Sequence, residues 1–134
     1  MTFALDTNIV IRYLRNEPNV IQNFRNAVMA NHDIIIPQAV DYEMCRGFRL
    51  VSADKKKAVY NMFLQDCKIA EMDVSSWKRA EEIYENLYRK GFTVGELDIL
   101  IAAYCLNYNY TIVTNNIKDF ENIDGLIITD WTQI

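Results

Sequence analysis

Short apolar runs alternate with longer amphipathic segments along this chain, and this alternation predicts strands separated by helices. Strand-like runs cover residues 2–5, 33–36, 69–72, 110–113 and 126–129. Helical segments cover residues 8–15, 18–30, 38–50 and 53–64, followed by a long helix that ends near Lys90–Gly91 and a helix that carries Asp98. We therefore expect an α/β domain with helices on both faces of a mainly parallel sheet of about four to five strands.

Local signals place several helix ends. Pro18 favours the start of the second helix, because proline is common in the first turn. Ser75 or Ser76 can cap the long helix. Thr93 with Glu96 three residues later is a capping-box pattern that predicts the start of the helix carrying Asp98.

Composition limits the class of protein. The 134 residues include only four glycines and two prolines, with no linker or repeat, so we expect residues 1–134 to form a single domain. No apolar run approaches the length of about 20 residues needed to span a bilayer. The N-terminus lacks the pattern of a signal peptide. Three widely spaced cysteines are expected to be buried thiols in a reducing cytoplasm.

Three acids stand in apolar surroundings. Asp6 ends the first strand, Glu43 lies one turn into a helix, and Asp98 interrupts the most hydrophobic stretch of the chain. Helix capping, a solvated helix face and a favourable helix dipole are their ordinary explanations, and Asp41 competes with Glu43. A buried carboxylate without partners is costly, however. We therefore expect these acids to gather around a divalent metal ion.

A fourth polar cluster follows the strand at residues 110–113. It contains Thr114, Asn115, Asn116 and Asp119. Asn and Asp after a strand are also ordinary turn chemistry. In a parallel sheet, however, this turn lies at the same edge as Asp6, where ligands bind.

Together these segments resemble the PIN-domain ribonucleases, and within them the VapC toxins of bacterial toxin–antitoxin pairs. The matching pieces are Leu5-Asp6-Thr7-Asn8, Glu43 with Gly47, Asp98-Ile99-Leu100-Ile101-Ala102-Ala103, Val113-Thr114-Asn115-Asn116 with Asp119-Phe120, and Ile128-Thr129-Asp130-Trp131. The resemblance covers essentially the whole chain. It implies a three-layer α/β/α PIN-like domain and a metal-dependent endoribonuclease that cuts single-stranded or loop RNA, with transfer RNA as a plausible target.

The resemblance also implies roles for individual residues. Asp6, Glu43 and Asp98 become the core metal ligands and, together with Asn116, the catalytic residues. Hard oxygen ligands suit Mg²⁺ or Mn²⁺. Asn116 stands where many relatives carry an acid: either Asp119 supplies the missing charge, or a second metal binds weakly. The polar residues placed beside the ligands are Thr7, Asn8 and Thr114.

Net charge and partners complete the picture. A net charge of −4 argues against binding nucleic acid through overall attraction, but it permits a local basic surface. Basic residues gather at the junction of two predicted helices, namely Arg46, Arg49, Lys55, Lys56 and Lys57. They form either an ordinary solvated face or a surface for RNA phosphates and a cognate VapB-like antitoxin. The resemblance implies a homodimer, and a surplus of aromatic residues supports it, the members being Phe48, Phe63, Trp77, Tyr84 and Tyr88.

Other functions fit less well. A receiver-like phosphoacceptor domain needs a pair of acids after its first strand, whereas Asp6 is followed by Thr7 and Asn8. A catalytically weak PIN-like module that binds RNA or protein would explain Asn116, but the three core acids are all present. Motifs of P-loop enzymes and of nucleophilic hydrolases are absent from the sequence.

Overall fold

The computed structural model describes residues 1–133 and has one five-stranded sheet, in which all paired strands are parallel. The strands lie in the order β3-β2-β1-β4-β5. Their bounds are β1 Thr2–Leu5, β2 Asp33–Pro37, β3 Lys68–Ala70, β4 Thr111–Val113 and β5 Ile128–Thr129. The helices are α1 Thr7–Leu14, α2 Pro18–Met29, α3 Gln38–Leu50, α4 Asp54–Phe63, α5 Val74–Lys90, α6 Glu96–Tyr108 and α7 Ile117–Phe120.

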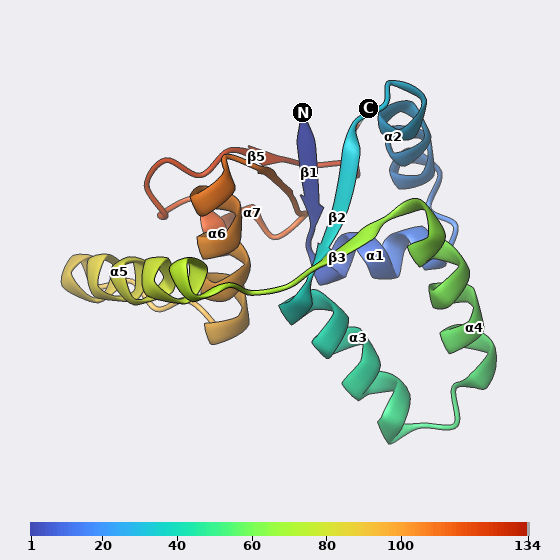
Figure 1. The fold of residues 1–134 in the computed structure, drawn as a ribbon, viewed down its shortest axis with the longest axis horizontal. Coiled ribbons are helices and arrows are strands. Elements are labelled where there is room, and N and C mark those ends of the chain that lie inside the picture. The colour runs from blue at the N-terminus through green and yellow to red at the C-terminus, as the bar shows by residue number, and fades with distance from the viewer. Residues whose placement is uncertain (134) are drawn as a thin grey trace.

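The three-layer α/β/α architecture expected from the sequence is confirmed. Figure 1 shows α1, α2 and α4 to one side of β1 and β2, and α5, α6 and α7 to the other. This division follows from the strand order, because right-handed crossovers in opposite directions place their helices on opposite faces. The chain reaches β2 and β3 in one direction from β1, then crosses the sheet to β4 and β5.

Local chemistry explains most element ends, with two corrections. Pro18 begins α2, and Gly91 ends α5 in a left-handed conformation with φ +81°. The cap of α5 is neither Ser75 nor Ser76 but Asp73, whose carboxylate accepts a hydrogen bond from the Ser76 amide.

The prediction of a capping box at the start of α6 is also wrong. Gly95 occupies the cap position, and no side chain bonds to the first turn of the helix. Thr93 and Glu96 are both exposed. The acidic residues of this turn, Glu96 and Asp98, still favour the helix dipole.

Helix α6 lies in the middle of the molecule. It contacts β4, α5, α3 and α7, and most of its other residues are half-buried besides the buried Ile99, Ile101, Ala102, Ala103 and Cys105. A helix enclosed in this way needs apolar residues all round rather than one apolar stripe. The polar residue that interrupts this run, Asp98, is therefore held at a fixed place beside the sheet.

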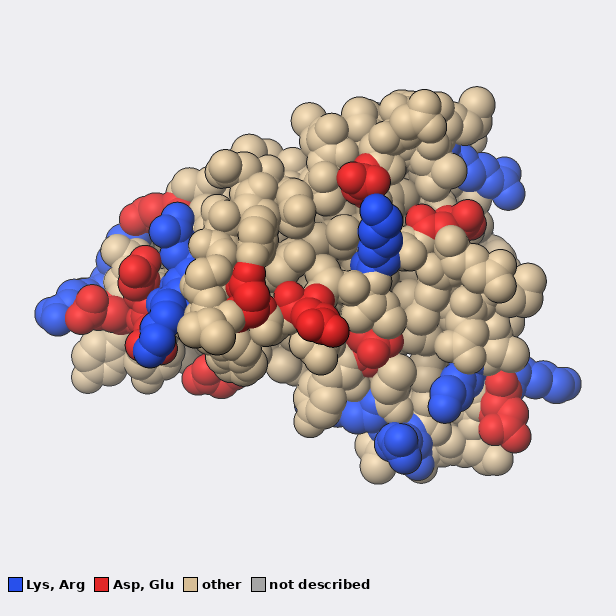
Figure 2. All heavy atoms as spheres, viewed as in Figure 1, with Lys and Arg blue, Asp and Glu red and all other residues tan. Residues whose placement is uncertain are grey.

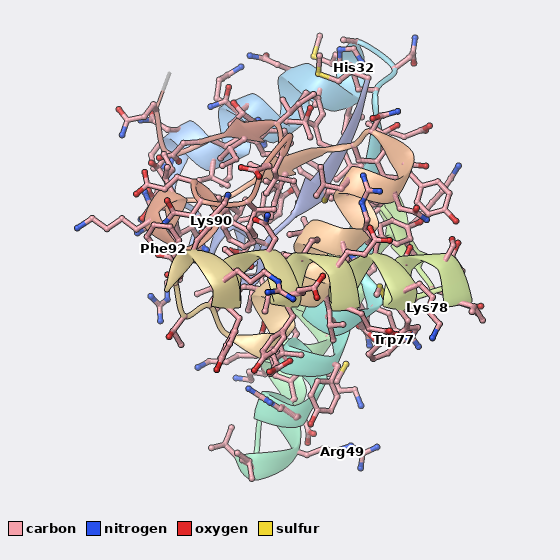
Figure 3. All side chains as sticks on the ribbon, turned by 90° about the vertical axis from the view of Figure 1, so that its left-hand side faces the viewer. His32, Arg49, Trp77, Lys78, Lys90 and Phe92 are labelled. Carbon is pink, nitrogen blue, oxygen red and sulfur yellow. The ribbon has the colours of Figure 1, made fainter. Side chains whose placement is uncertain are left out.

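The expected aromatic surplus divides into two groups. Phe63 is buried in the core, and Phe48 is half-buried against Tyr60, so these two do not contribute to an exposed patch. Trp77, Tyr84 and Tyr88 are exposed along α5, as expected for a contact surface. In Figure 3, α5 crosses the molecule with Trp77 near one end and Lys90 near the other.

The cysteines are less uniformly buried than expected. Cys105 is buried, whereas Cys45 and Cys67 are half-buried, and all are free thiols. Burial, with a contribution from the nearby Asp6 charge, raises the pKa of Cys105 to about 12. Thiols held in their protonated form are inert as nucleophiles. Across residues 1–133, no helix has the length and apolar character that crossing a membrane requires.

Candidate functional site

The candidate site lies at the carboxyl ends of β1 and β4. These strands are neighbours, with Leu5 opposite Val113, so Asp6 and Thr114 leave the sheet side by side. After β1 the chain goes on to β2, which pairs with one side of β1, whereas β4 pairs with its other side. The carboxyl ends of β1 and β4 therefore mark the point where the order of the strands reverses, the switch point of the topology. Crevices for ligands form at such points in open parallel sheets.

Asp6 is buried, with 3% of its surface exposed, and three donors hold its carboxylate. The Thr7 amide donates to Oδ1 at 2.8 Å, while the Asn8 carboxamide and the Thr114 hydroxyl donate to Oδ2 at 2.7 and 2.8 Å. A carboxylate oxygen accepts about two hydrogen bonds. Oδ2 is therefore filled, and Oδ1 keeps one acceptor position. The expected places of Thr7, Asn8 and Thr114 beside Asp6 agree with these contacts.

Glu43 reaches the same region from α3. It is half-buried, and its Oε1 accepts a hydrogen bond of 2.9 Å from the Thr7 hydroxyl. The competing acid Asp41 faces elsewhere, because it accepts a hydrogen bond from the Tyr60 hydroxyl at 2.8 Å. Asp41 therefore has a structural partner, and Glu43 is the acid of α3 that lies beside Asp6.

Asp98 and Asp119 bring further negative charge to the site. Asp98 is half-buried rather than fully buried, and Asp119 is exposed. Burial, followed by the charges of Asp6, Asp119 and Glu43, raises the pKa of Asp98 from 3.8 to about 7. Burial likewise raises the pKa of Asp6, with a smaller contribution from Glu43. The four acids from α3, α6, α7 and the end of β1 thus act on one another.

Asn116 is exposed at the start of α7, and its carboxamide has no hydrogen-bond partner among residues 1–133. Its amide donates to the Thr114 hydroxyl at 3.0 Å, and the same hydroxyl donates to Oδ2 of Asp6. The structure therefore puts Asn116 at the rim of the site without a bond to any acid.

The chemistry of the donor set fits a hard divalent cation. Its members are carboxylates whose charges, added to burial, raise the pKa of Asp98, and the ion pairs in the described chain join other acids to Lys and Arg. Within residues 1–133, however, no three acidic, His or Cys side chains converge as a ready-made metal shell. The described side chains therefore supply suitable ligands and an uncompensated negative field, but not a closed coordination sphere.

An apolar groove of about 550 Å³ opens beside Glu43, between α1, α3 and α4. Its walls include Ile11, Met44, Phe48, Val51 and Val59. The sequence analysis missed this groove. The sequence held no clear signal for it, because only the structure shows that Val51 and Val59 are exposed; apolar side chains left open to solvent often mark a partner surface.

The basic residues divide around this groove. Lys55 and Lys56 line it, together with Arg15, which the sequence analysis did not select. Arg46 instead lies over the Tyr42 ring at 5.2 Å, and Arg49 points outward from the far end of α3 in Figure 3. Figure 2 shows acidic side chains across the middle of the molecule and basic ones over the ends of α3 and α4.

Comparison with known proteins agrees with this geometry. The PIN domain family matches residues 3–126. The chain is 33% identical to ribonuclease VapC2 of Rickettsia felis, with 98% of each chain covered, and 29% identical to the tRNA(fMet)-specific endonuclease VapC of Salmonella typhimurium, again with 98% of each covered.

Its structure is also similar to a chain of VapBC2 from Rickettsia felis, which was solved bound to a promoter DNA fragment. The TM-score is 0.92 and the identity 28%, and the match covers 98% of this chain and 99% of the other. With such agreement over nearly its whole length, the chain belongs to the PIN-domain family and, within it, to the VapC ribonucleases.

Proposed function

We propose that this protein is an endoribonuclease dependent on Mg²⁺ or Mn²⁺ and the toxin of a VapBC-like toxin–antitoxin pair. The observation that carries the proposal is that Asp6 and Glu43 lie close enough to Asp98, near the switch point of the sheet, for their charges to act on it. Burial, together with the charges of Asp6, Asp119 and Glu43, raises the pKa of Asp98 to about 7. Such clustered acids are typical of a site that is completed by a cation.

Asp6 and Asp98 would hold the ion, with Glu43 and Asp119 adding charge. A bound divalent ion activates water and offsets negative charge on the phosphate. Asn8 and Thr114 fill Oδ2 of Asp6, so a ligand would bind at the acceptor position that Oδ1 keeps.

Thr7 fixes one oxygen of Glu43, which leaves the other oxygen free to accept a proton or hydrogen bond from the attacking water.

The test uses purified protein, a labelled transfer RNA and Asp98→Asn. This change removes charge with little change of volume, so cleavage should be lost while the fold persists. Asp33→Asn is the same substitution at an exposed position, at the amino end of the strands and so away from the site. This variant should cleave normally. Full activity of Asp98→Asn, or full activity in excess chelator, would contradict the proposal, and a wild-type protein that does not cleave RNA would favour a binding module instead. Transfer RNA is the first substrate to test because the Salmonella relative is named for one.

The groove beside Glu43 is the proposed place for the antitoxin. It combines apolar walls with Lys55, Lys56 and Arg15, which suits an apolar segment that also carries acidic groups. Val59, 50% exposed in the wall, can be tested as Val59→Glu. This variant should bind the cognate antitoxin more weakly, because a charged side chain would replace part of the apolar wall of the groove. Unchanged antitoxin affinity by calorimetry would exclude this groove.

A homodimer through α5 is also proposed. Trp77, Tyr84 and Tyr88 are 49%, 52% and 74% exposed along this helix. Burying such a stripe against a second copy would remove large aromatic surfaces from water. Light scattering at high micromolar concentration should give a dimer, and Trp77→Lys should shift it toward monomer. A strictly monomeric wild-type protein would refute the dimer.

A further inference from the structure

A hydrogen-bonded chain joins the C-terminal segment to Asp6 through residues that no role has yet explained. Arg12 on α1 donates to both carboxylate oxygens of Glu17, at 3.1 and 3.0 Å, and its second nitrogen donates to Oδ1 of Asn115 at 3.0 Å. The Asn115 carboxamide in turn donates to Asp130 and to Thr132, both at 3.2 Å. The Asn115 side chain is thus held at both of its polar ends.

The backbone of the same residue reaches the catalytic acid. The Asn115 amide donates to Oδ1 of Asn8 at 2.9 Å. Because a backbone amide can only donate, the Asn8 atom that faces it must be the carbonyl oxygen. The Asn8 nitrogen must then point the other way, where it donates to Oδ2 of Asp6 at 2.7 Å and to Thr114 at 3.2 Å.

We propose that Arg12 and Asn115 are positioning residues, which use Asp130 and Thr132 as anchors to orient Asn8 and thereby the ligand oxygen of Asp6. The inference rests on the proposed function, since it concerns the same acidic site. Partners of this kind fix the orientation of a ligand, and their loss typically costs about 10- to 100-fold in metal affinity or activity. Arg12 suits the task because its planar guanidinium reaches Glu17 and Asn115 at once, which a lysine ammonium does not.

A simpler alternative is that Asn115 only fastens the C-terminal segment. The chain offers a matched control for that alternative. Asn23 on α2 donates to the carbonyl oxygens of Trp131 and Gln133, at 3.1 and 2.9 Å, but contacts none of Asn8, Asp6 or Asn115. Asn23→Ala therefore loosens the same segment without touching the path to Asp6.

The experiment measures Mn²⁺ binding to RNA-free protein by electron paramagnetic resonance, together with thermal melting and the kcat and KM of cleavage. Asn115→Ala should weaken Mn²⁺ binding roughly tenfold and lower kcat at limiting metal. KM for RNA should stay unchanged. Asn23→Ala should bind Mn²⁺ like the wild type, although both variants melt at lower temperature.

Arg12→Met gives an independent measure. It should weaken Mn²⁺ binding in the same direction, and combining it with Asn115→Ala should add little, because the two residues act along one path. If Asn115→Ala is too unstable to purify, Arg12→Met against Asn23→Ala carries the comparison.

Equal Mn²⁺ affinity in the Asn115 and Asn23 variants would overturn the inference while leaving the proposed function intact. A wild-type protein that neither binds Mn²⁺ nor cleaves RNA would overturn both.

Discussion

Asp98 should destabilise the metal-free protein at the pH where the enzyme is active. Its pKa rises from 3.8 to about 7 in the fold, because burial and the charges of Asp6, Asp119 and Glu43 disfavour the carboxylate. That difference corresponds to about 4 kcal/mol against the ionised form. Asp98 is only half-buried, so solvent screening reduces the effective penalty to about 1–2 kcal/mol.

The direction in which stability changes with pH follows from the linkage between proton binding by Asp98 and folding. Below pH 3.8 the carboxyl is protonated in both the folded and the unfolded state, and no penalty exists. As the pH rises toward 7, the unfolded chain ionises while the folded one resists, so stability falls; above about 7 the full penalty remains. Asp98→Asn removes the charge. In chelator at pH 8 it should therefore raise the melting temperature, by about 3–8 °C for a domain of this size.

Differential scanning calorimetry or fluorescence at pH 8 and pH 5 tests this result, with Asp33→Asn as the matched control. The gain of Asp98→Asn should shrink at pH 5, where the wild-type group has taken up a proton. Saturating Mg²⁺ should stabilise the wild type and leave the variant unchanged. A melting temperature of Asp98→Asn at or below that of the wild type in chelator at pH 8 would refute the reasoning.

Two further predictions concern the same site. Thr7→Val removes the hydroxyl that bonds Glu43 and should lower cleavage roughly tenfold in single-turnover assays, with little change in melting; wild-type cleavage would show that Glu43 needs no such support. Asn116→Asp should lower the Mg²⁺ concentration for half-maximal cleavage, and Asp119→Asn should raise it without abolishing activity, because each carboxylate adds attraction for the ion. If neither substitution changes the Mg²⁺ concentration for half-maximal cleavage, the polar residues of this turn stabilise the turn and do not affect the metal site.

The sequence by itself determined the elements and the identity of the acids. Apolar residues recur every two positions in a strand and about every 3.6 positions in a helix, and both spacings can be recognised from nearby residues alone. The sequence therefore predicted β1 and α3 with their observed bounds. Asp6 and Asp98 were conspicuous for the same local reason, since each is an acid beside apolar residues. Short elements with weak periodicity, such as α7, were missed.

Only the tertiary structure decided which of these groups meet. The hydroxyl of Thr114 bonds to Asp6 across 108 positions of sequence, a pairing that depends on β1 and β4 being neighbours in the sheet. The same packing assigned Asp41 to Tyr60 and left Glu43 beside Thr7. The raised pKa of Asp98 likewise comes from burial in the folded chain, together with charges on other elements. Local patterns encode which face of a helix or strand is buried, whereas the approach of distant side chains follows from how those faces pack together.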